Sequence, residues 1–194
     1  MYRKWSFIII LLLISGCAQE SVKTTTKPDK PQVVLADSDK RLYNKALWDI
    51  KKKRYKKAEV ILNKLISKYP DASGPLPNKG VIYSVRKDLA EAEKLFLQAL
   101  SKNKNLVQAR NYLAVLYRKQ GKFKEAKDML DAAIAADPYY ANAYYNLGIL
   151  YELYLQKPEK ALENYQLYLD LKKDGDKQVS QWISLLQRQI SAGK

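Results

Sequence analysis

The chain has 194 residues, enough for one domain of ordinary size plus a leader. Apolar residues make up 47% of it, with seven Gly and seven Pro, a balance that favours helices over a turn-rich β fold or a disordered chain. Histidine is absent and Cys17 is the single cysteine, which excludes intrachain disulfides and cysteine zinc sites and removes the commonest general base. The formal charge of +15 suits nucleic acid, an anionic membrane surface or acidic partners, so the compartment has to decide among them.

Residues 1–16 have the pattern of an export signal. Arg3 and Lys4 form a short positive region, and an apolar run from Trp5 to Ile14 follows, broken by one serine. About ten residues are too few to cross a hydrocarbon core about 30 Å thick as a helix. The pattern therefore predicts a secretory signal peptide.

The segment that ends at Cys17 resembles the lipobox of bacterial lipoproteins. It reads Leu-Ile-Ser-Gly-Cys, with an aliphatic residue and then small residues before the cysteine. The resemblance implies cleavage before Cys17 and a covalent diacylglycerol and N-acyl chain on that residue, with no other cofactor. Two acyl chains already give stable anchoring. The alternative is an ordinary signal peptide, or a buried helix, with a stray cysteine.

The residue after the cysteine is Ala18 and not aspartate. By the sorting rule of Gram-negative lipoproteins, the resemblance then implies an outer-membrane lipoprotein that faces the periplasm. Nucleic acid is not an expected partner in that compartment, despite the charge. Residues 17–38 are predicted to be the lipidated cysteine and a flexible linker, because the segment has three consecutive threonines, two Lys-Pro pairs and no helical period. About 20 residues reach at most ~70 Å.

Small residues recur every 34 positions in the rest of the chain. One series is Ala46, Gly80, Ala114 and Gly148. Another is Ala58, Ala92 and Ala126, with Ala161 one residue late. Large side chains keep the same period at Leu62, Phe96 and Leu130, and at Tyr83, Tyr117 and Tyr151. Antiparallel helices approach closely only where Cβ bulk is absent, and one helix pair cannot bury its apolar face alone, so stacked helix pairs are predicted.

This pattern resembles the tetratricopeptide repeat (TPR). The resemblance covers residues 39–175 and implies an all-α fold, a right-handed α-α superhelix of four helix-turn-helix repeats. The repeats are predicted at 39–72, 73–106, 107–140 and 141–175. Residues 176–194 are predicted to form a capping helix and tail, with Asp176 as N-cap and apolar residues at helical spacing.

Three of the repeats depart from the pattern. The second begins Ser73-Gly-Pro-Leu-Pro, which predicts that its first helix starts late, with a proline in the first turn. The fourth has one extra residue in its turn, around Gln156 to Pro158. The first has Asp49 where the others have tyrosine.

TPR stacks bind partners along the concave face that their first helices line. Carrying the family's positions over gives twelve candidate partner-binding residues. They are Tyr43, Asn44, Leu47, Asn78, Val81, Asn111, Tyr112, Val115, Arg118, Tyr145, Asn146 and Ile149. Asn44, Asn78 and Asn146 hold the same place in their repeats and resemble the asparagine ladders that hold extended peptides, since an amide both donates and accepts. The alternative is that asparagine there only supports the helix start.

The densest basic cluster lies at the turn inside the first repeat, between Lys51 and Lys57. It could touch anionic head groups. The simpler interpretation is a solvated turn. Tyrosines crowd the last repeat, and those that are exposed would favour protein contact there.

No Gly-rich phosphate loop, nucleophile elbow or metal-ligand cluster occurs in the sequence. The predicted function is therefore a non-catalytic scaffold for protein–protein interaction, lipid-anchored in the cell envelope, which assists assembly or stability of an envelope complex. The expected partner is a protein or extended peptide, with the membrane contacted through the lipid and no small-molecule substrate. The alternatives are an accessory lipoprotein of a type IV pilus secretin or TonB-ExbB-type system, and a basic binder of anionic membrane or cell-wall surface.

Overall fold

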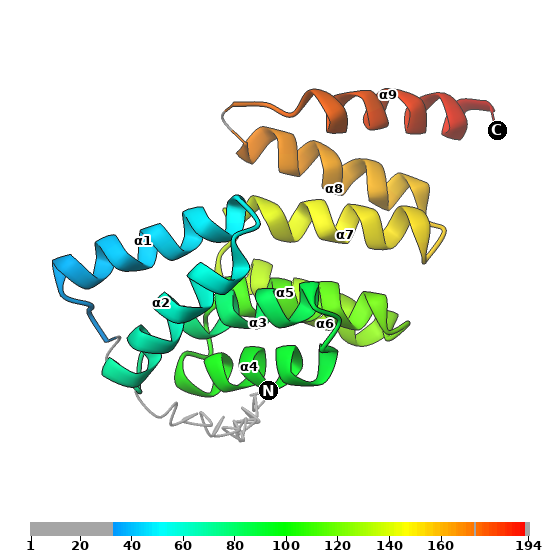
Figure 1. The fold of residues 1–194 in the computed structure, drawn as a ribbon. Coiled ribbons are helices and arrows are strands. Elements are labelled where there is room, and N and C mark those ends of the chain that lie inside the picture. Colours follow the sequence, from blue (N-terminus) through cyan, green and yellow to red (C-terminus); the bar gives the residue numbers. More distant parts are fainter. Residues whose placement is uncertain (1–32, 173, 193–194) are drawn as a thin grey trace, which may run out of the picture.

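The computed structural model describes residues 33–172 and 174–192; the predicted signal peptide, Cys17 and most of the predicted linker lie outside these residues. The described chain forms nine α-helices and no strand (Figure 1). The helices are α1 (Asp37–Lys51), α2 (Tyr55–Lys68), α3 (Pro75–Val85), α4 (Leu89–Lys102), α5 (Val107–Lys119), α6 (Phe123–Ala136), α7 (Ala141–Leu153), α8 (Pro158–Leu171) and α9 (Lys177–Ala192).

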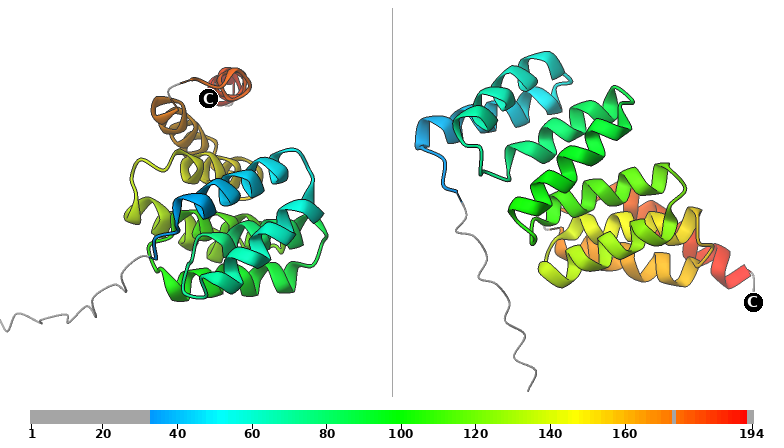
Figure 2. Two further views of the ribbon diagram at one scale, coloured as in Figure 1. Left: turned by 60° about the vertical axis from the view of Figure 1, so that its left-hand side comes forward. Right: turned by 90° about the horizontal axis from the view of Figure 1, so that it is seen from below.

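The first eight helices form four antiparallel hairpins that stack in chain order, and α9 packs on α8. The first helices of the hairpins, α1, α3, α5 and α7, also contact one another in sequence and so line one face of the stack. Figure 2 shows how the stack curves. The predicted all-α superhelix of four repeats with a capping helix is confirmed. Among the helices of the described residues, none has the length and apolarity that a membrane span requires.

The periodic small residues mark where the two helices of each hairpin approach. Gly80 lies against the ring of Phe96, and Gly148 lies against the ring of Tyr165. A Cβ added at Gly148 would come within 2.5 Å of the Tyr165 ring. In the first and third hairpins the same place holds Ala46 or Ala114, and a leucine replaces the ring. Glycine is therefore present where the facing side chain is an aromatic ring.

The predicted irregularities of the second and fourth hairpins are confirmed. Helix α3 begins at Pro75, whose missing N–H costs nothing in the first turn, and it spans only 11 residues. The turn between α7 and α8 is one residue longer than the other hairpin turns, and Gln156 in it has a positive φ of 51°.

The N-terminus of the stack starts slightly earlier than predicted. Helix α1 begins at Asp37, so the predicted boundary of the linker at residue 38 falls inside the helix. The carboxylate of Asp39 is buried and accepts hydrogen bonds from Lys68 Nζ at 2.6 Å and the Tyr69 hydroxyl at 2.7 Å. The Lys68 ammonium holds the pKa of Asp39 below its usual value. These contacts fasten the first turn of α1 to the end of α2.

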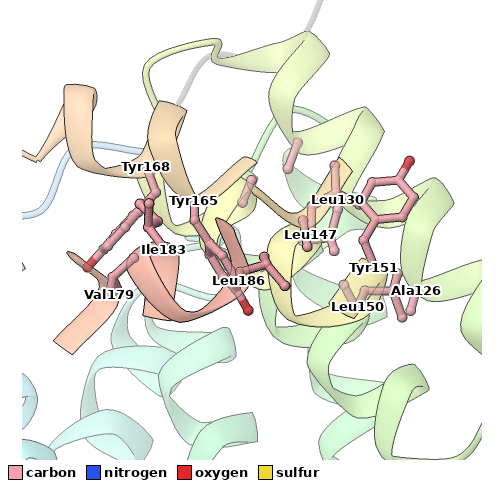
Figure 3. Close-up of a cluster of buried hydrophobic side chains, with 14 of the residues drawn as sticks. Ala126, Leu130, Leu147, Leu150, Tyr151, Tyr165, Tyr168, Val179, Ile183 and Leu186 are labelled. Atoms are coloured by element: carbon pink, nitrogen blue, oxygen red, sulfur yellow. The ribbon is translucent and has the colours of Figure 1, made fainter. Parts of the chain in front are cut away.

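The C-terminal helix covers the apolar end of the stack, as predicted. Val179, Ile183 and Leu186 are buried against Tyr165 and Tyr168 of α8 (Figure 3). The predicted cap is also confirmed: Asp176 Oδ1 accepts hydrogen bonds from the N–H groups of residues 178 and 179. Its other oxygen accepts from Lys172 Nζ at 2.9 Å and the Tyr168 hydroxyl at 3.0 Å.

These contacts predict a pH-dependent contribution of Asp176 to stability. The Lys172 ammonium, the Val179 N–H and the Tyr168 hydroxyl lower the pKa of Asp176 to about 2. A lowered pKa in the folded state stabilises the fold above the unfolded pKa of about 3.9 and loses that effect as the pH falls towards 2. Asp176→Asn keeps the capping geometry but removes the charge, so we expect a loss of about 1–2 kcal/mol at pH 7.

Thermal unfolding of both chains, followed by circular dichroism between pH 7 and pH 2.5, measures this contribution. The difference between the wild type and Asp176→Asn should shrink below pH 4. A difference that is constant over the whole range would mean that the charge of Asp176 contributes nothing. Asp174→Asn is the matched control, because Asp174 is exposed and no hydrogen bond or ion pair of the described residues involves it.

Candidate partner-binding surface

Residues from α1, α3 and α5 form a groove of about 370 Å³ on the face that the first helices line. Four of the predicted residues, Tyr43, Leu47, Asn78 and Tyr112, lie together along it. The others that line it are Gly74, Pro77, Leu106 and Gln108. Gln108 was not among the residues predicted from the sequence, although it lies one helical turn before Tyr112 and so shares its face.

The hydroxyl of Tyr43 is held in place at the floor of this groove. It donates to the carbonyl oxygen of Gly74 at 2.9 Å and accepts from Asn78 Nδ2 at 2.6 Å. Burial raises the pKa of Tyr43 to about 12, so the phenol stays neutral at physiological pH. The groove therefore presents a fixed aromatic surface and the carbonyl oxygen of the Asn78 side chain.

A second, more apolar pocket of about 170 Å³ adjoins the groove at Tyr112, which lines both. It contains the predicted residues Val81 and Val115. The remaining lining residues are Ser84, Val85, Leu89, Phe96, Leu116 and Lys119. A partner that fills both spaces therefore contacts Tyr112.

The predicted row of asparagine amides does not form. Asn146 is buried, and its Nδ2 donates to Asn111 Oδ1 at 2.8 Å and to the carbonyl oxygen of Asn142 at 3.0 Å. Asn78 Nδ2 donates to the Tyr43 hydroxyl and to the carbonyl oxygen of Gly74. In both cases the amide reaches a side chain 35 residues earlier, in the preceding repeat.

The amide donors of Asn78 and Asn146 therefore join successive repeats to each other. Asn44 differs from both, because its side chain is exposed. The polar side chain one repeat and one residue earlier, Tyr43 or Asn111, was the sequence signal for this pairing.

The remaining predicted residues lie towards the fourth hairpin. Tyr145 packs in an aromatic cluster with Tyr168 at 5.1 Å and Trp182 at 6.3 Å between ring centroids. Arg118 lies over the ring of Tyr154 at 5.6 Å. Ile149 is half-buried against the core. This end of the surface is therefore more closely packed than the groove.

Two family models of the tetratricopeptide repeat match the chain, over residues 42–72 and 107–174. No curated protein sequence matches it significantly. Several solved structures share its fold. One is pilF of Pseudomonas aeruginosa, with 18% identity and a TM-score of 0.70, over 80% of this chain and 70% of that one.

Another is MamA residues 41–end from Desulfovibrio magneticus RS-1, with 23% identity and a TM-score of 0.59, over 81% of this chain and 88% of that one. A third is the first TPR domain of Spaghetti (RPAP3) bound to the HSP90 peptide SRMEEVD, with 21% identity and a TM-score of 0.56, over 61% and 93%. Proteins of this kind mediate protein–protein interaction. With its four stacked hairpins and both family matches, the chain belongs to the tetratricopeptide repeat family.

Proposed function

We propose that this chain is a non-catalytic scaffold, lipid-anchored at Cys17 on the periplasmic side of the outer membrane, that holds an extended segment of a protein partner in the groove of α1, α3 and α5. The groove carries this proposal, because it gathers Tyr43, Leu47, Asn78 and Tyr112 into one space of about 370 Å³. One structure of similar fold holds a peptide, which supports a peptide as the occupant here.

The dimensions favour an extended segment over a globular one. Packed helices lie about 8–10 Å apart, so three successive first helices span about 20 Å. An extended chain covers that distance in about six residues at about 3.3 Å each. Alternate side chains of such a segment would enter the groove and the adjoining pocket, which meet at Tyr112. The exposed amide of Gln108 can bond to its backbone.

A narrower proposal is an accessory role in a type IV pilus secretin or TonB-ExbB-type system. The layout favours it: a lipobox, a linker and a short TPR stack in one chain. The likeness to pilF concerns the fold and supports the architecture rather than the process. Cofractionation with the proteins of one such system would support this narrower role.

Photo-crosslinking in the cell tests the groove. A photoreactive phenylalanine analogue at Tyr112 keeps an aromatic ring at the centre of the groove and should yield one discrete adduct. The same analogue at Leu97, which is 47% exposed on α4, is the control and should yield none. Adding Leu47→Asp places an unpaired charge in the groove and should lower the yield from Tyr112 at least tenfold, because the charge has to be desolvated.

The thermal unfolding midpoint of each variant shows whether the fold is intact. An adduct from Tyr112 that persists at full yield with Leu47→Asp would place the partner outside the groove. Equal adduct yields from the analogue at Tyr112 and at Leu97 would also place the partner outside the groove.

A further inference from the structure

The turns inside the four hairpins lie on the same edge of the stack. Successive first helices run side by side in the same direction, so each hairpin turns at the same end. In Figure 1 the turns of the last three hairpins lie on the right, away from the start of α1 and from the connection to α9. We call these four turns, residues 51–57, 85–88, 119–122 and 153–157, the turn edge.

The first turn of this edge carries a concentrated positive charge. Its five lysines are all exposed, and within the described residues none forms an ion pair with a carboxylate. They are Lys51, Lys52, Lys53, Lys56 and Lys57. The neighbouring carboxylates are engaged elsewhere, since Asp49 pairs with Arg54 at 3.0 Å and Glu59 pairs with Arg86 at 2.6 Å. No carboxylate among the described residues therefore neutralises these five charges, and they repel one another.

The stability of helix α2 does not explain these lysines. A helix N-terminus favours acidic residues and a capping side chain, because its free N–H groups carry partial positive charge. Helix α2 instead begins Tyr55-Lys56-Lys57, with no acidic residue in its first turn and no side-chain cap. The equivalent helix α4 follows the usual pattern, with Asp88 accepting from the Glu91 N–H at 3.1 Å.

The backbone of the turns gives a second, independent indication. Lys53 and Lys87 have positive φ values of 58° and 66°. The third hairpin has Gly121 at the same place, with a φ of 76°. Glycine adopts this conformation without a Cβ conflict, whereas lysine is strained there. Folding alone would favour glycine in the first two turns, so their lysines point to a role outside the fold.

Exposed apolar side chains accompany the charges along the turn edge. Trp48, just before the first turn, is 49% exposed, and the Arg54 guanidinium lies 3.9 Å from the centre of its ring. Val85 is exposed at the second turn, and Leu153 and Tyr154 are exposed at the fourth. Lysine and arginine with exposed tryptophan, tyrosine and leucine are the composition of surfaces that lie at a membrane interface.

We propose that the turn edge, centred on the five lysines of the first turn, docks on the anionic head groups of a phospholipid bilayer. A bilayer fits better than an acidic protein segment, because exposed lysines continue beyond the first turn, at Lys87, Lys122 and Lys157, and apolar side chains accompany them along the same edge. This surface shares no residue with the groove of about 370 Å³ and would orient that groove relative to the membrane. Val85 and Lys119 of the turn edge also line the smaller pocket that adjoins the groove. Helix α1 is about 22 Å long and the linker reaches at most ~70 Å, so a chain anchored at Cys17 can lay this edge on the leaflet.

Lysine labelling on vesicles tests the proposal with the full chain. The probe is a water-soluble acetylating reagent, applied with vesicles of phosphatidylcholine alone or with added phosphatidylglycerol, and mass spectrometry reads each lysine. On anionic vesicles the five lysines should be labelled at least about threefold less than on vesicles of phosphatidylcholine alone. Salt at about 0.5 M should restore their labelling, because it screens exposed charges. Lys64, Lys104 and Lys177 are exposed away from the turn edge and should not change. Equal labelling of the five lysines on both kinds of vesicle would overturn the proposal.

Paired variants separate docking from folding and from anchoring. Lys53→Gly with Lys87→Gly should leave the unfolding midpoint unchanged or raised, because glycine fits both turns. In a Cys17→Ser background it should weaken flotation with anionic vesicles about 25-fold, since each lysine near such a surface contributes about fivefold. Lys64→Gln with Lys104→Gln removes the same charge and should change flotation less than twofold.

Flotation that responds equally to the two pairs would reduce the effect to net charge and overturn the proposal. Protection of the five lysines by polyglutamate but not by vesicles would also overturn it, in favour of an acidic protein. If Cys17 carries no lipid, the wild type and Cys17→Ser will float alike, and the comparison of the two pairs still holds.

Discussion

Gly148→Leu should unfold the fourth hairpin and lower the stability of the whole stack by more than about 3 kcal/mol. A Cβ at this position would come within 2.5 Å of Tyr165 Cε1 and 2.6 Å of Cδ1. The ring cannot move aside easily, because Tyr165 is fully buried and its hydroxyl donates to Glu152 at 2.6 Å. Burial raises the pKa of Tyr165 and keeps this hydroxyl protonated as a donor.

Gly148→Ala tests the same contact at a smaller scale. In an open helix, alanine in place of glycine stabilises by about 1 kcal/mol. Here we expect a net loss of about 1–3 kcal/mol, because the added methyl group overlaps the Tyr165 ring. Thermal unfolding followed by circular dichroism measures both variants. Gly74→Ala is the control, since its added Cβ would find no atom nearer than 3.7 Å.

A double variant shows whether the ring is the cause. Gly148→Ala with Tyr165→Leu reproduces the pairing of Ala114 with Leu130 in the third hairpin. The double variant should lose less free energy of unfolding than the two single variants lose together, because the two positions are in contact. Simple additivity, or wild-type stability of Gly148→Leu, would contradict the packing described for this hairpin.

Cys17→Ser should move the protein from the detergent phase to the aqueous phase in a detergent partition of the cell envelope. The proposed anchor depends on acyl chains, and each buried methylene group contributes about 0.8 kcal/mol to membrane affinity. Serine has no thiol to acylate. The apolar run of the leader has about ten residues and is too short to span the bilayer, so it does not replace the lipid.

The mass of the N-terminal peptide provides a direct check on the same chain. In the wild type it should begin at Cys17 and carry the mass of a diacylglycerol and a further acyl chain. Ser21→Ala, a nearby change that leaves the lipobox intact, should retain both the mass and the partition. A wild-type peptide without the added mass, or a Cys17→Ser chain that stays in the detergent phase at high salt, would remove the anchor from the proposed function.

The hydrogen-bond partners of the asparagine side chains were not predicted from the sequence. The period placed Asn78 and Asn146 on the face of the first helices, and the structure agrees. Their amides bond to side chains 35 residues earlier, a pairing that depends on how far each repeat is rotated against the preceding one. A 34-residue period carries no information about that rotation, so the period alone does not distinguish a free asparagine from an engaged one. The one sequence signal for the pairing is the polar side chain 35 residues earlier, Tyr43 or Asn111.

The sequence by itself determined the helices, their hairpin order, the late start at Pro75, the longer fourth turn and the cap at Asp176. Each of these follows from local chemistry. Residues without a large side chain mark where helices pair, a proline without an N–H fits the first turn of a helix, and a carboxylate can accept hydrogen bonds from the N–H groups at a helix start. Only the tertiary structure decided which inward side chains stay free to form the groove, and that five lysines on one turn have no carboxylate partner among residues 33–172 and 174–192. Both depend on distances between segments about 30 residues apart, which are set by the packing of one repeat on the next.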